Sequence, residues 1–115
     1  MTDCLFCRIV VGEIPSTEIL GTESTYAFAD IDPAAPTHVL VVPRRHIADA
    51  AALDATTDAE LLGQLFATAR EVARIAGVDE SGYRLVFNVG EDATNSVAHL
   101  HLHVIGGRAL SWPPG

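Results

Sequence analysis

Apolar residues recur along the chain with two different periods, and the first is that of short β-strands. Four segments are rich in β-branched or aromatic residues and end at turn-forming residues, namely residues 25–30, 38–43, 83–90 and 99–105. A weaker segment of the same kind lies at residues 18–21. The pattern therefore predicts five strands.

The second period is that of an α-helix and covers residues 56–77. Thr57 and Glu60 have the spacing of a capping box at its start, and Gly77 suits the left-handed position that follows many helices. A shorter helical turn is expected at residues 46–53. The apolar residues that share one face of the long helix are Leu62, Leu65, Phe66, Ala69, Val72 and Ala76.

The order of these elements predicts the fold class. Strands that mostly follow one another, with one long helix among them, indicate an antiparallel sheet covered on one face. The 115 residues show no internal repeat and no linker, and a chain of this length buries about two-thirds of its unfolded surface. We expect a single α+β domain over residues 1–115, with a five-stranded antiparallel sheet, one long helix, a short helix and a C-terminal tail at residues 106–115.

The overall charge limits the choice of partner. A formal net charge of -8 repels nucleic acid, so we expect no nucleic-acid partner, and any phosphate site must depend on local donors. No apolar run approaches the roughly 20 residues of a membrane span, so no membrane partner is expected. The first ten residues lack the basic region and apolar core of a secretory signal, which favours a cytoplasmic protein with reduced cysteines.

Three of the five histidines stand at alternate positions, His99, His101 and His103. On a strand, these imidazoles share one face and the apolar residues between them share the other. The simplest alternative is an exposed edge with incidental histidines. One metal bound by all three does not fit, because His99 and His103 would lie ~13 Å apart on a strand while zinc binds nitrogen at ~2.1 Å. We therefore expect the three to have different roles.

Cys4 and Cys7 form a C-x-x-C motif, which alone is compatible with half of a zinc site, a redox pair or two ordinary thiols. The redox interpretation is the least favoured, because the segment lacks the βαβ surroundings and the helix N-terminus of thioredoxin-like sites. A structural zinc needs four ligands, and histidine is the obvious source of the other two.

The sequence resembles the histidine-triad (HIT) family of nucleotide hydrolases and transferases. The family motif, His-apolar-His-apolar-His followed by two apolar residues, is met in full from His99 to Ile105. Residues 4–16, 30–47 and 88–115 resemble the amino-terminal segment, the nucleotide loop with the second motif, and the active-site end. Ser96 and the terminal "GGRALSWPPG" resemble the branch of histidine-triad nucleotide-binding proteins, which act as purine nucleoside phosphoramidases, more than the diadenosine polyphosphate hydrolases.

The resemblance implies catalytic roles for three residues. His101 would attack phosphorus and form a nucleotidyl-histidine, with its other ring nitrogen oriented by a backbone carbonyl. His103 would contact the phosphate or the leaving group. Ser96 would donate its hydroxyl to the leaving atom or to a phosphate oxygen, although a serine in such a loop can also be only a turn residue.

The resemblance also implies a nucleotide site. Asn88 and His38 would be polar groups on the phosphate side, and Asn88 can alternatively be an edge amide satisfied within the protein. Asp30 would accept both ribose hydroxyls, with Ile31 and Phe28 near the base. Its alternative role is a turn residue at the start of a loop.

Zinc and the oligomer follow from the same resemblance. Cys4, Cys7, His46 and His99 would hold a structural Zn²⁺, with an empty site and reduced thiols as the alternative; no organic cofactor is expected.

The family members of this branch are commonly homodimers. We expect the long helix and a nearby strand to form the interface, and Trp112 to reach the partner's active site. A tail folded on its own subunit is the alternative.

These features predict an enzyme that hydrolyses purine nucleoside 5′-phosphoramidates, with an AMP- or GMP-type nucleotide as its small-molecule partner. Dinucleoside polyphosphate hydrolysis or nucleotidyl transfer would use the same residues. A nucleotide-binding or partner-binding module with incidental turnover is the alternative from another class.

Overall fold

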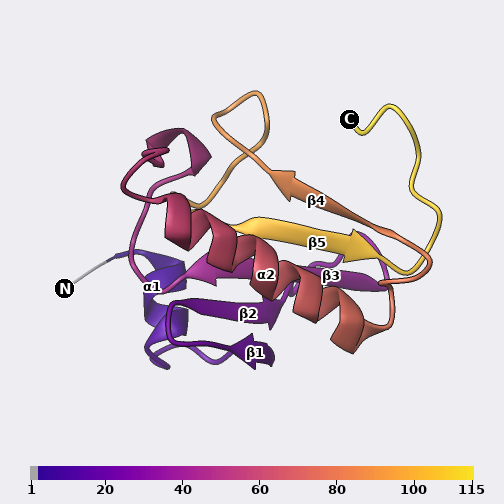
Figure 1. Cartoon of the computed structure of the whole chain (residues 1–115), viewed down its shortest axis with the longest axis horizontal. Coiled ribbons are helices and arrows are strands. Elements are labelled where there is room, and N and C mark those ends of the chain that lie inside the picture. Colours follow the sequence, from indigo (N-terminus) through magenta and orange to yellow (C-terminus); the bar gives the residue numbers. More distant parts are fainter. Residues whose placement is uncertain (1–2) are drawn as a thin grey trace.

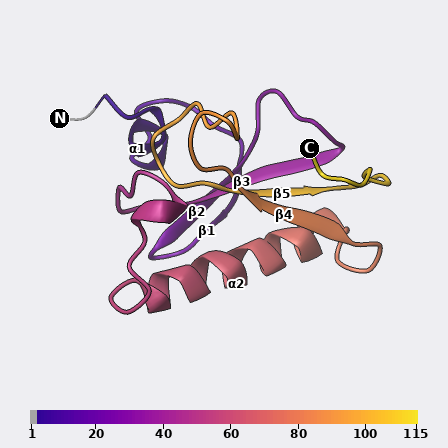
Figure 2. The same ribbon diagram turned by 90° about the horizontal axis from the view of Figure 1, so that it is seen from above.

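The computed structural model describes residues 3–115, so the first two residues of the predicted domain lie outside the described part. A five-stranded sheet, with neighbours antiparallel throughout and the order β1-β2-β3-β5-β4, forms the centre of the molecule. The long helix α2 crosses one face of the sheet, and the short helix α1 lies on the other side (Figures 1 and 2). This arrangement confirms the α+β fold with a five-stranded antiparallel sheet. The elements are α1 (Leu5–Val10), β1 (Glu18–Gly21), β2 (Thr25–Ala29), β3 (Thr37–Pro43), η1 (Ala50–Ala52), α2 (Ala59–Ala76), β4 (Tyr83–Phe87) and β5 (Leu102–Gly106).

Apolar clusters bury both faces of the middle of the sheet. Leu102 and Val104 of β5 pack with Val41 of β3 against α2, and Leu65 is among the helix residues that meet them. On the other face, the second cluster joins β2 and β3 to α1: Phe6, Ile9, Tyr26, Phe28, Leu40 and Val42. Burial on both faces explains why β3 is a continuous apolar run instead of an alternating one.

The two ends of α2 differ in how well the sequence predicts them. Gly77 adopts the left-handed conformation at the C-terminal end with φ 76°, as predicted. The expected capping box of Thr57 and Glu60 is wrong, because the helix begins after Asp58 and Asp58 is the N-cap residue. The Asp54 carboxylate instead accepts the backbone N–H of Thr57 at 2.9 Å, which keeps Thr57 in the preceding turn.

Three further boundaries differ from the sequence prediction. The strand expected at residues 99–105 begins only at Leu102, and the strand expected at 83–90 ends at Phe87. The helical turn expected at residues 46–53 is the three-residue η1. Helix α1 was not predicted, and its presence also corrects the expectation that the cysteine pair lacks a helix N-terminus, since Cys4 is its N-cap residue. Within residues 3–115, no helix is both long enough and apolar enough to cross a membrane.

Candidate functional site

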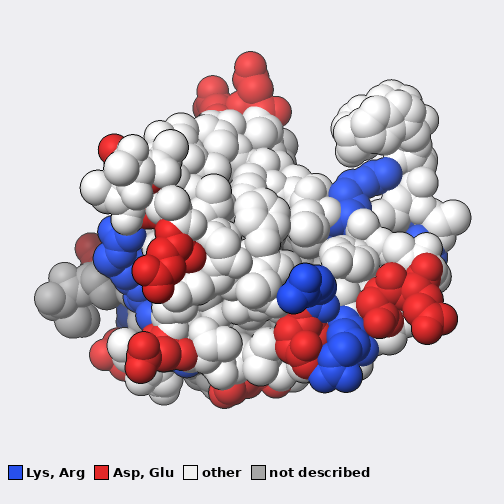
Figure 3. Space-filling model, viewed as in Figure 1, with Lys and Arg blue, Asp and Glu red and all other residues white. Residues whose placement is uncertain are grey.

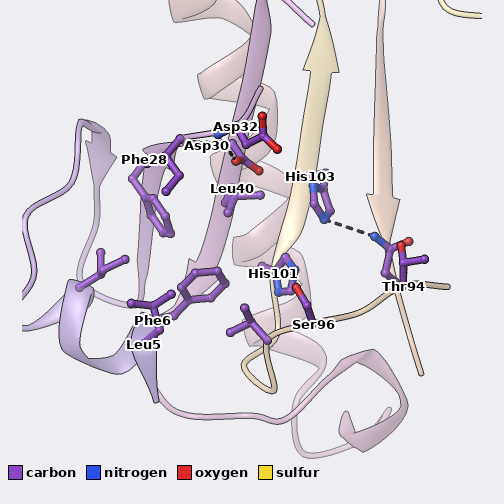
Figure 4. A pocket seen from close by; sticks show the side chains of 14 residues that line it. Leu5, Phe6, Phe28, Asp30, Asp32, Leu40, Thr94, Ser96, His101 and His103 are labelled. Atoms are coloured by element: carbon purple, nitrogen blue, oxygen red, sulfur yellow. Dashed lines mark hydrogen bonds between the residues drawn. The ribbon is translucent and has the colours of Figure 1, made fainter. Parts of the chain in front are cut away.

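A pocket of about 570 Å³ opens on the α1 side of the sheet, between α1, the loop after β2 and the loop that leads to β5. One wall is apolar and the other is polar, so the pocket suits a ligand with an apolar end and a charged end. The close view in Figure 4 shows Phe6 and Phe28 on one side and His101, His103 and Ser96 on the other. The principal lining residues are Leu5, Phe6, Ile9, Phe28 and Leu40 on the apolar wall, and Asp30, Asn88, Ser96, His101 and His103 on the polar wall.

His101 and His103 lie side by side at the polar wall, with ring centroids 5.0 Å apart. The Nδ1 atom of His101 lies 2.7 Å from the backbone carbonyl oxygen of His99, which can only accept. Nδ1 therefore carries the proton and donates it. A neutral imidazole of this tautomer has its lone pair on Nε2, which is the form that a nucleophile requires.

His38 and the backbone of Ala34 fix the tautomer of His103. The Ala34 N–H donates to Nδ1 of His38 at 2.9 Å, so neutral His38 carries its proton on Nε2. That Nε2 lies 2.9 Å from Nδ1 of His103 and 3.4 Å from a carboxylate oxygen of Asp30. His38 therefore donates to His103, which leaves the proton of neutral His103 on its Nε2.

The Nε2 of His103 lies 3.4 Å from the side-chain nitrogen of Asn88, the contact drawn as a dashed line in Figure 4. In this tautomer Nε2 of His103 and the amide nitrogen of Asn88 both carry hydrogen, so neither accepts from the other and both N–H groups can donate to a third group. Convergent donors favour an anion there, such as a phosphate oxygen. This local arrangement is what a protein with a net charge of -8 needs to bind a phosphate group.

Burial is the main reason why His103 is neutral. Desolvation, followed by the neighbouring imidazoles of His101 and His38, lowers the pKa of His103 to about 4. Asp30 acts in the opposite direction but less strongly. At pH 7 the ring is therefore a neutral hydrogen-bond donor in the polar wall.

The residues expected near the sugar and base lie at the end of β2. Asp30 stands at the rim of the pocket, where one carboxylate oxygen accepts the backbone N–H of Asp32 at 2.9 Å. Phe28 is buried and meets the ring of Phe6 at a centroid distance of 5.4 Å. Ile31 also lines the pocket but is 99% exposed, so its side chain is a surface group at the entrance.

Ser96 lines the pocket from the loop before β5, on the same wall as His101. Thr94 of this loop also lines the pocket and has a φ of 59°, in the left-handed region that non-glycine residues rarely adopt. The structure does not bring Trp112 to this pocket. Its side chain is 81% exposed and lies in the tail beside β4.

A second cluster joins the four cysteine and histidine residues that were expected to bind zinc. Its Sγ and Nδ1 atoms all lie within 4.8 Å of one another. Nδ1 of His99 lies 3.3 Å from Sγ of Cys4, 3.4 Å from Sγ of Cys7 and 3.2 Å from Nδ1 of His46. Bond lengths of about 2.1 Å to nitrogen and 2.3 Å to sulfur give a tetrahedron with edges of roughly 3.3 to 3.8 Å. The donor set and its spacing therefore fit a structural zinc ion.

The orientation of His99 also fits a metal ligand. Its Nε2 lies 2.9 Å from the carbonyl oxygen of Pro43 and must donate to it, so the lone pair of Nδ1 faces the cluster. The side chain is fully buried, and this burial lowers the pKa of His99. A neutral imidazole is the form that binds metal.

The apolar wall that α1 supplies was not predicted from the sequence. Leu5, Phe6 and Ile9 line the pocket, and Phe6 and Ile9 are buried. The three-residue spacing of Phe6 and Ile9 was the available signal, because such residues share a helix face.

Comparisons with known proteins agree with this fold. A family model described as HIT domain matches residues 11–110. A HIT-like protein of 13.2 kDa from Azospirillum brasilense is 50% identical over 107 residues, which are 92% of this chain and 87% of that protein. The 14 kDa zinc-binding protein of Zea mays is 42% identical over 96% of this chain and 87% of its own length. The solved structure of a HIT family hydrolase from Legionella pneumophila superimposes with a TM-score of 0.95 at 46% identity, covering 98% of this chain and all of that chain. Matches of this extent show that the chain belongs to the HIT family.

Proposed function

We propose that the protein hydrolyses purine nucleoside 5′-phosphoramidates through a nucleotidyl-His101 intermediate. The observation that carries this proposal is the bond from Nδ1 of His101 to the carbonyl of His99. It leaves Nε2 of His101 as the nucleophilic atom, on the same wall as the N–H donors of His103 and Asn88. The similar Legionella pneumophila protein is itself called a hydrolase.

The pocket accommodates the parts of such a substrate in order. The base lies against the apolar wall, where the rings of Phe6 and Phe28 meet edge to face. The ribose hydroxyls donate to the carboxylate of Asp30 at the rim. The phosphate lies at the polar wall, where His103 and Asn88 donate to its oxygens.

The reaction takes place in two displacements at phosphorus. Nε2 of His101 forms a bond to phosphorus while the bond from phosphorus to the amine breaks, and the amine leaves with the electron pair. The hydroxyl of Ser96 delivers the proton that the amine takes up. Water then attacks phosphorus and gives a proton back to the Ser96 oxygen, which restores its hydroxyl, while the bond from phosphorus to Nε2 of His101 breaks and nucleoside monophosphate leaves. The carbonyl of His99 stabilises the positive charge that the His101 ring carries in the intermediate.

The Cys4, Cys7, His46 and His99 cluster would hold a structural zinc ion, as the name of the Zea mays protein supports. With four protein ligands the ion has no open position, so its contribution is to tie the chain together. A site that needs two thiolates fits a reducing compartment such as the cytoplasm.

The same proposal includes a homodimer. Strand β4 is an outer strand of the sheet, and Leu85 on it and Phe66 on α2 are 36% and 42% exposed. Figure 3 shows that the surface over the start of α2 and β4 carries few charged side chains. A helix face with few charged side chains beside an outer strand suits pairing with a second copy. The tail with Trp112 lies beside β4, where it can extend to the partner.

Substrate profiling tests the proposed activity. Purified protein is incubated separately with adenosine phosphoramidate, a diadenosine polyphosphate and an ADP-sugar at equal concentrations, and AMP release is measured. We expect the phosphoramidate to give the highest kcat/KM. A higher value for the dinucleotide would contradict the phosphoramidase assignment, and binding of AMP without turnover of any substrate would contradict the assignment as an enzyme.

A further inference from the structure

Helix α1 belongs to both the cysteine–histidine cluster and the pocket. Cys4 is its N-cap residue and Cys7 lies in its first turn, and both belong to the cluster. The residues between and after the cysteines, Leu5, Phe6 and Ile9, line the pocket. This short helix therefore presents sulfur to the cluster and apolar side chains to the pocket.

The ring of Phe6 is the direct contact between the two sites. Its centroid lies 6.0 Å from that of His99 in the cluster and 5.1 Å from that of His101 in the pocket, with both contacts edge to face. The same ring meets Phe28 at 5.4 Å. Only 5% of Phe6 is exposed, so its position is determined by these neighbours and by α1.

Helix α1 is too short to be stable by itself, so its position depends on its contacts, which are the packing of Phe6 and Ile9 on β2 and β3 and the cysteine–histidine cluster at its start. It has six residues, whereas isolated helices shorter than about 12 to 15 residues are marginal in water. The cluster connects this helix to the chain after β3 through His46 and to the chain before β5 through His99. A metal bound by all four residues would attach the start of α1 to two segments that are distant in sequence.

We infer that metal occupancy of the Cys4, Cys7, His46 and His99 cluster sets the affinity of the pocket for nucleotide, because it fixes α1 and thereby places Phe6 against His101 and Phe28. Phe6 is a positioning residue in this arrangement. The identity of the ligand as a nucleotide rests on the proposed function, while the coupling rests on the contacts of α1.

The first experiment compares metal-loaded protein with protein stripped by a chelator under reducing conditions. AMP affinity is measured by calorimetry, and protection of the amides of residues 5–10 is measured by hydrogen exchange. If stripping leaves α1 ordered for about a tenth of the time, the Kd for AMP rises about tenfold. We expect this change together with loss of protection in α1 and continued protection in α2, and we expect added Zn²⁺ to reverse both.

The second experiment leaves the metal in place and changes the contact. Phe6→Leu keeps an apolar side chain but loses the ring edge at His101 and at Phe28. We expect it to retain the metal, to raise KM and to lower kcat for a phosphoramidate, each by several-fold, because an imprecisely placed nucleophile reacts more slowly. The matched control is Val10→Ala in the same helix, because Val10 packs against the same apolar cluster as Phe6 but does not line the pocket. It should retain the wild-type kcat and KM.

The outcomes separate the two proposals. If loaded wild-type protein fails to bind AMP, the proposed function is wrong and the inference falls with it. If loaded protein binds AMP and metal-free folded protein binds it equally well, the coupling alone is wrong. Should the stripped protein unfold, the Phe6→Leu variant decides, and unchanged kcat and KM would overturn the inference.

Discussion

The Nδ1–H of His101 donates to the carbonyl oxygen of His99 at 2.7 Å, so two members of the histidine row are joined through the backbone of one and the ring of the other. The side chains of the two residues lie in different sites. The ring of His99 belongs to the cysteine–histidine cluster, and the ring of His101 lines the pocket. A shift of His99 would therefore move both a proposed metal ligand and the carbonyl that sets the tautomer of His101.

The low pKa of His103 predicts how stability depends on pH. The folded protein holds this pKa at about 4, below its ordinary value of 6.5, so between these values the unfolded chain binds a proton that the folded chain does not. The contribution of neutral His103 to the free energy of unfolding is complete above pH 6.5 and decreases as the pH falls towards 4. The slope that one group contributes is at most about 1.4 kcal/mol per pH unit.

His103→Gln should remove this part of the slope. The free energy of unfolding of both proteins is measured with denaturant at several pH values from 7 to 4.5. Titration of the cysteine and histidine residues of the cluster affects both proteins equally, so it cancels when the two curves are subtracted. The free energy of unfolding of the wild type should fall more steeply with acid than that of the variant. Parallel curves would show that His103 is not held neutral by the fold.

The zinc cluster predicts the metal content and the effect of losing a ligand. Protein purified without added metal should contain about one zinc per chain by elemental analysis. Cys4→Ser should lower the midpoint of thermal unfolding, because the cluster ties the start of α1 to two distant segments. Its effect on kcat should be no larger than the several-fold effect of Phe6→Leu, because Cys4 acts on the pocket only through α1. A protein with reduced thiols and no zinc would rule out the structural zinc site.

The exposed β4 edge predicts a dimer. Light scattering at micromolar concentration should give twice the chain mass of 12.2 kDa. Trp112→Ala should change substrate specificity without dissociating the dimer if the tail reaches the partner's pocket. A monomer mass would contradict the proposed interface. If the protein is a dimer and Trp112→Ala leaves substrate specificity unchanged, the result would favour a tail that folds on its own subunit.

Gly63 inside α2 and Gly77 at its C-cap form a matched pair that tests the assigned C-terminal end of the helix. A Cβ at either position meets nothing within 4 Å, but Gly77 has a φ of 76° and Gly63 lies inside the helix. Gly77→Ala should destabilise the protein by about 1 kcal/mol, and Gly63→Ala should stabilise it by roughly 0.5 to 1 kcal/mol. Chemical denaturation of the three proteins measures both changes, and the same sign for both would contradict the assigned end of the helix.

Periodicity was sufficient to predict the sheet and α2, because their apolar residues repeat often enough to show a face. Periodicity did not predict α1, because six residues contain too few repeats to show a face. It also failed at the start of α2, where the carboxylate of Asp54 competes successfully for the N–H of Thr57. The spacing of Thr57 and Glu60 does not show which acceptor binds the N–H of Thr57.

The histidine row shows the same limit within the site. The alternating pattern predicts that His101 and His103 share a face, and both line the pocket. The strand, however, begins later than expected. The Leu100 N–H donates to the carbonyl of Ile47 and the carbonyl of His99 accepts from the ring of His101, so these groups are not paired with a neighbouring strand. The tautomers of His38 and His103 depend on the bond from the Ala34 N–H to His38 and on the bond from His38 to His103. The second bond joins residues that are distant in sequence, so the sequence alone does not predict it.

The nucleophilic role of His101 is tested most directly by trapping the intermediate. Wild-type protein is mixed with a slow phosphorothioate analogue of the phosphoramidate, quenched, digested and examined by mass spectrometry, alongside His101→Asn. We predict a nucleotidyl adduct on His101 in the wild type, and in the variant a loss of about 10⁴-fold in kcat, or roughly 5.5 kcal/mol of barrier, with AMP binding retained. Undiminished turnover by a correctly folded His101→Asn protein would contradict the mechanism and leave nucleotide binding as the function of the pocket.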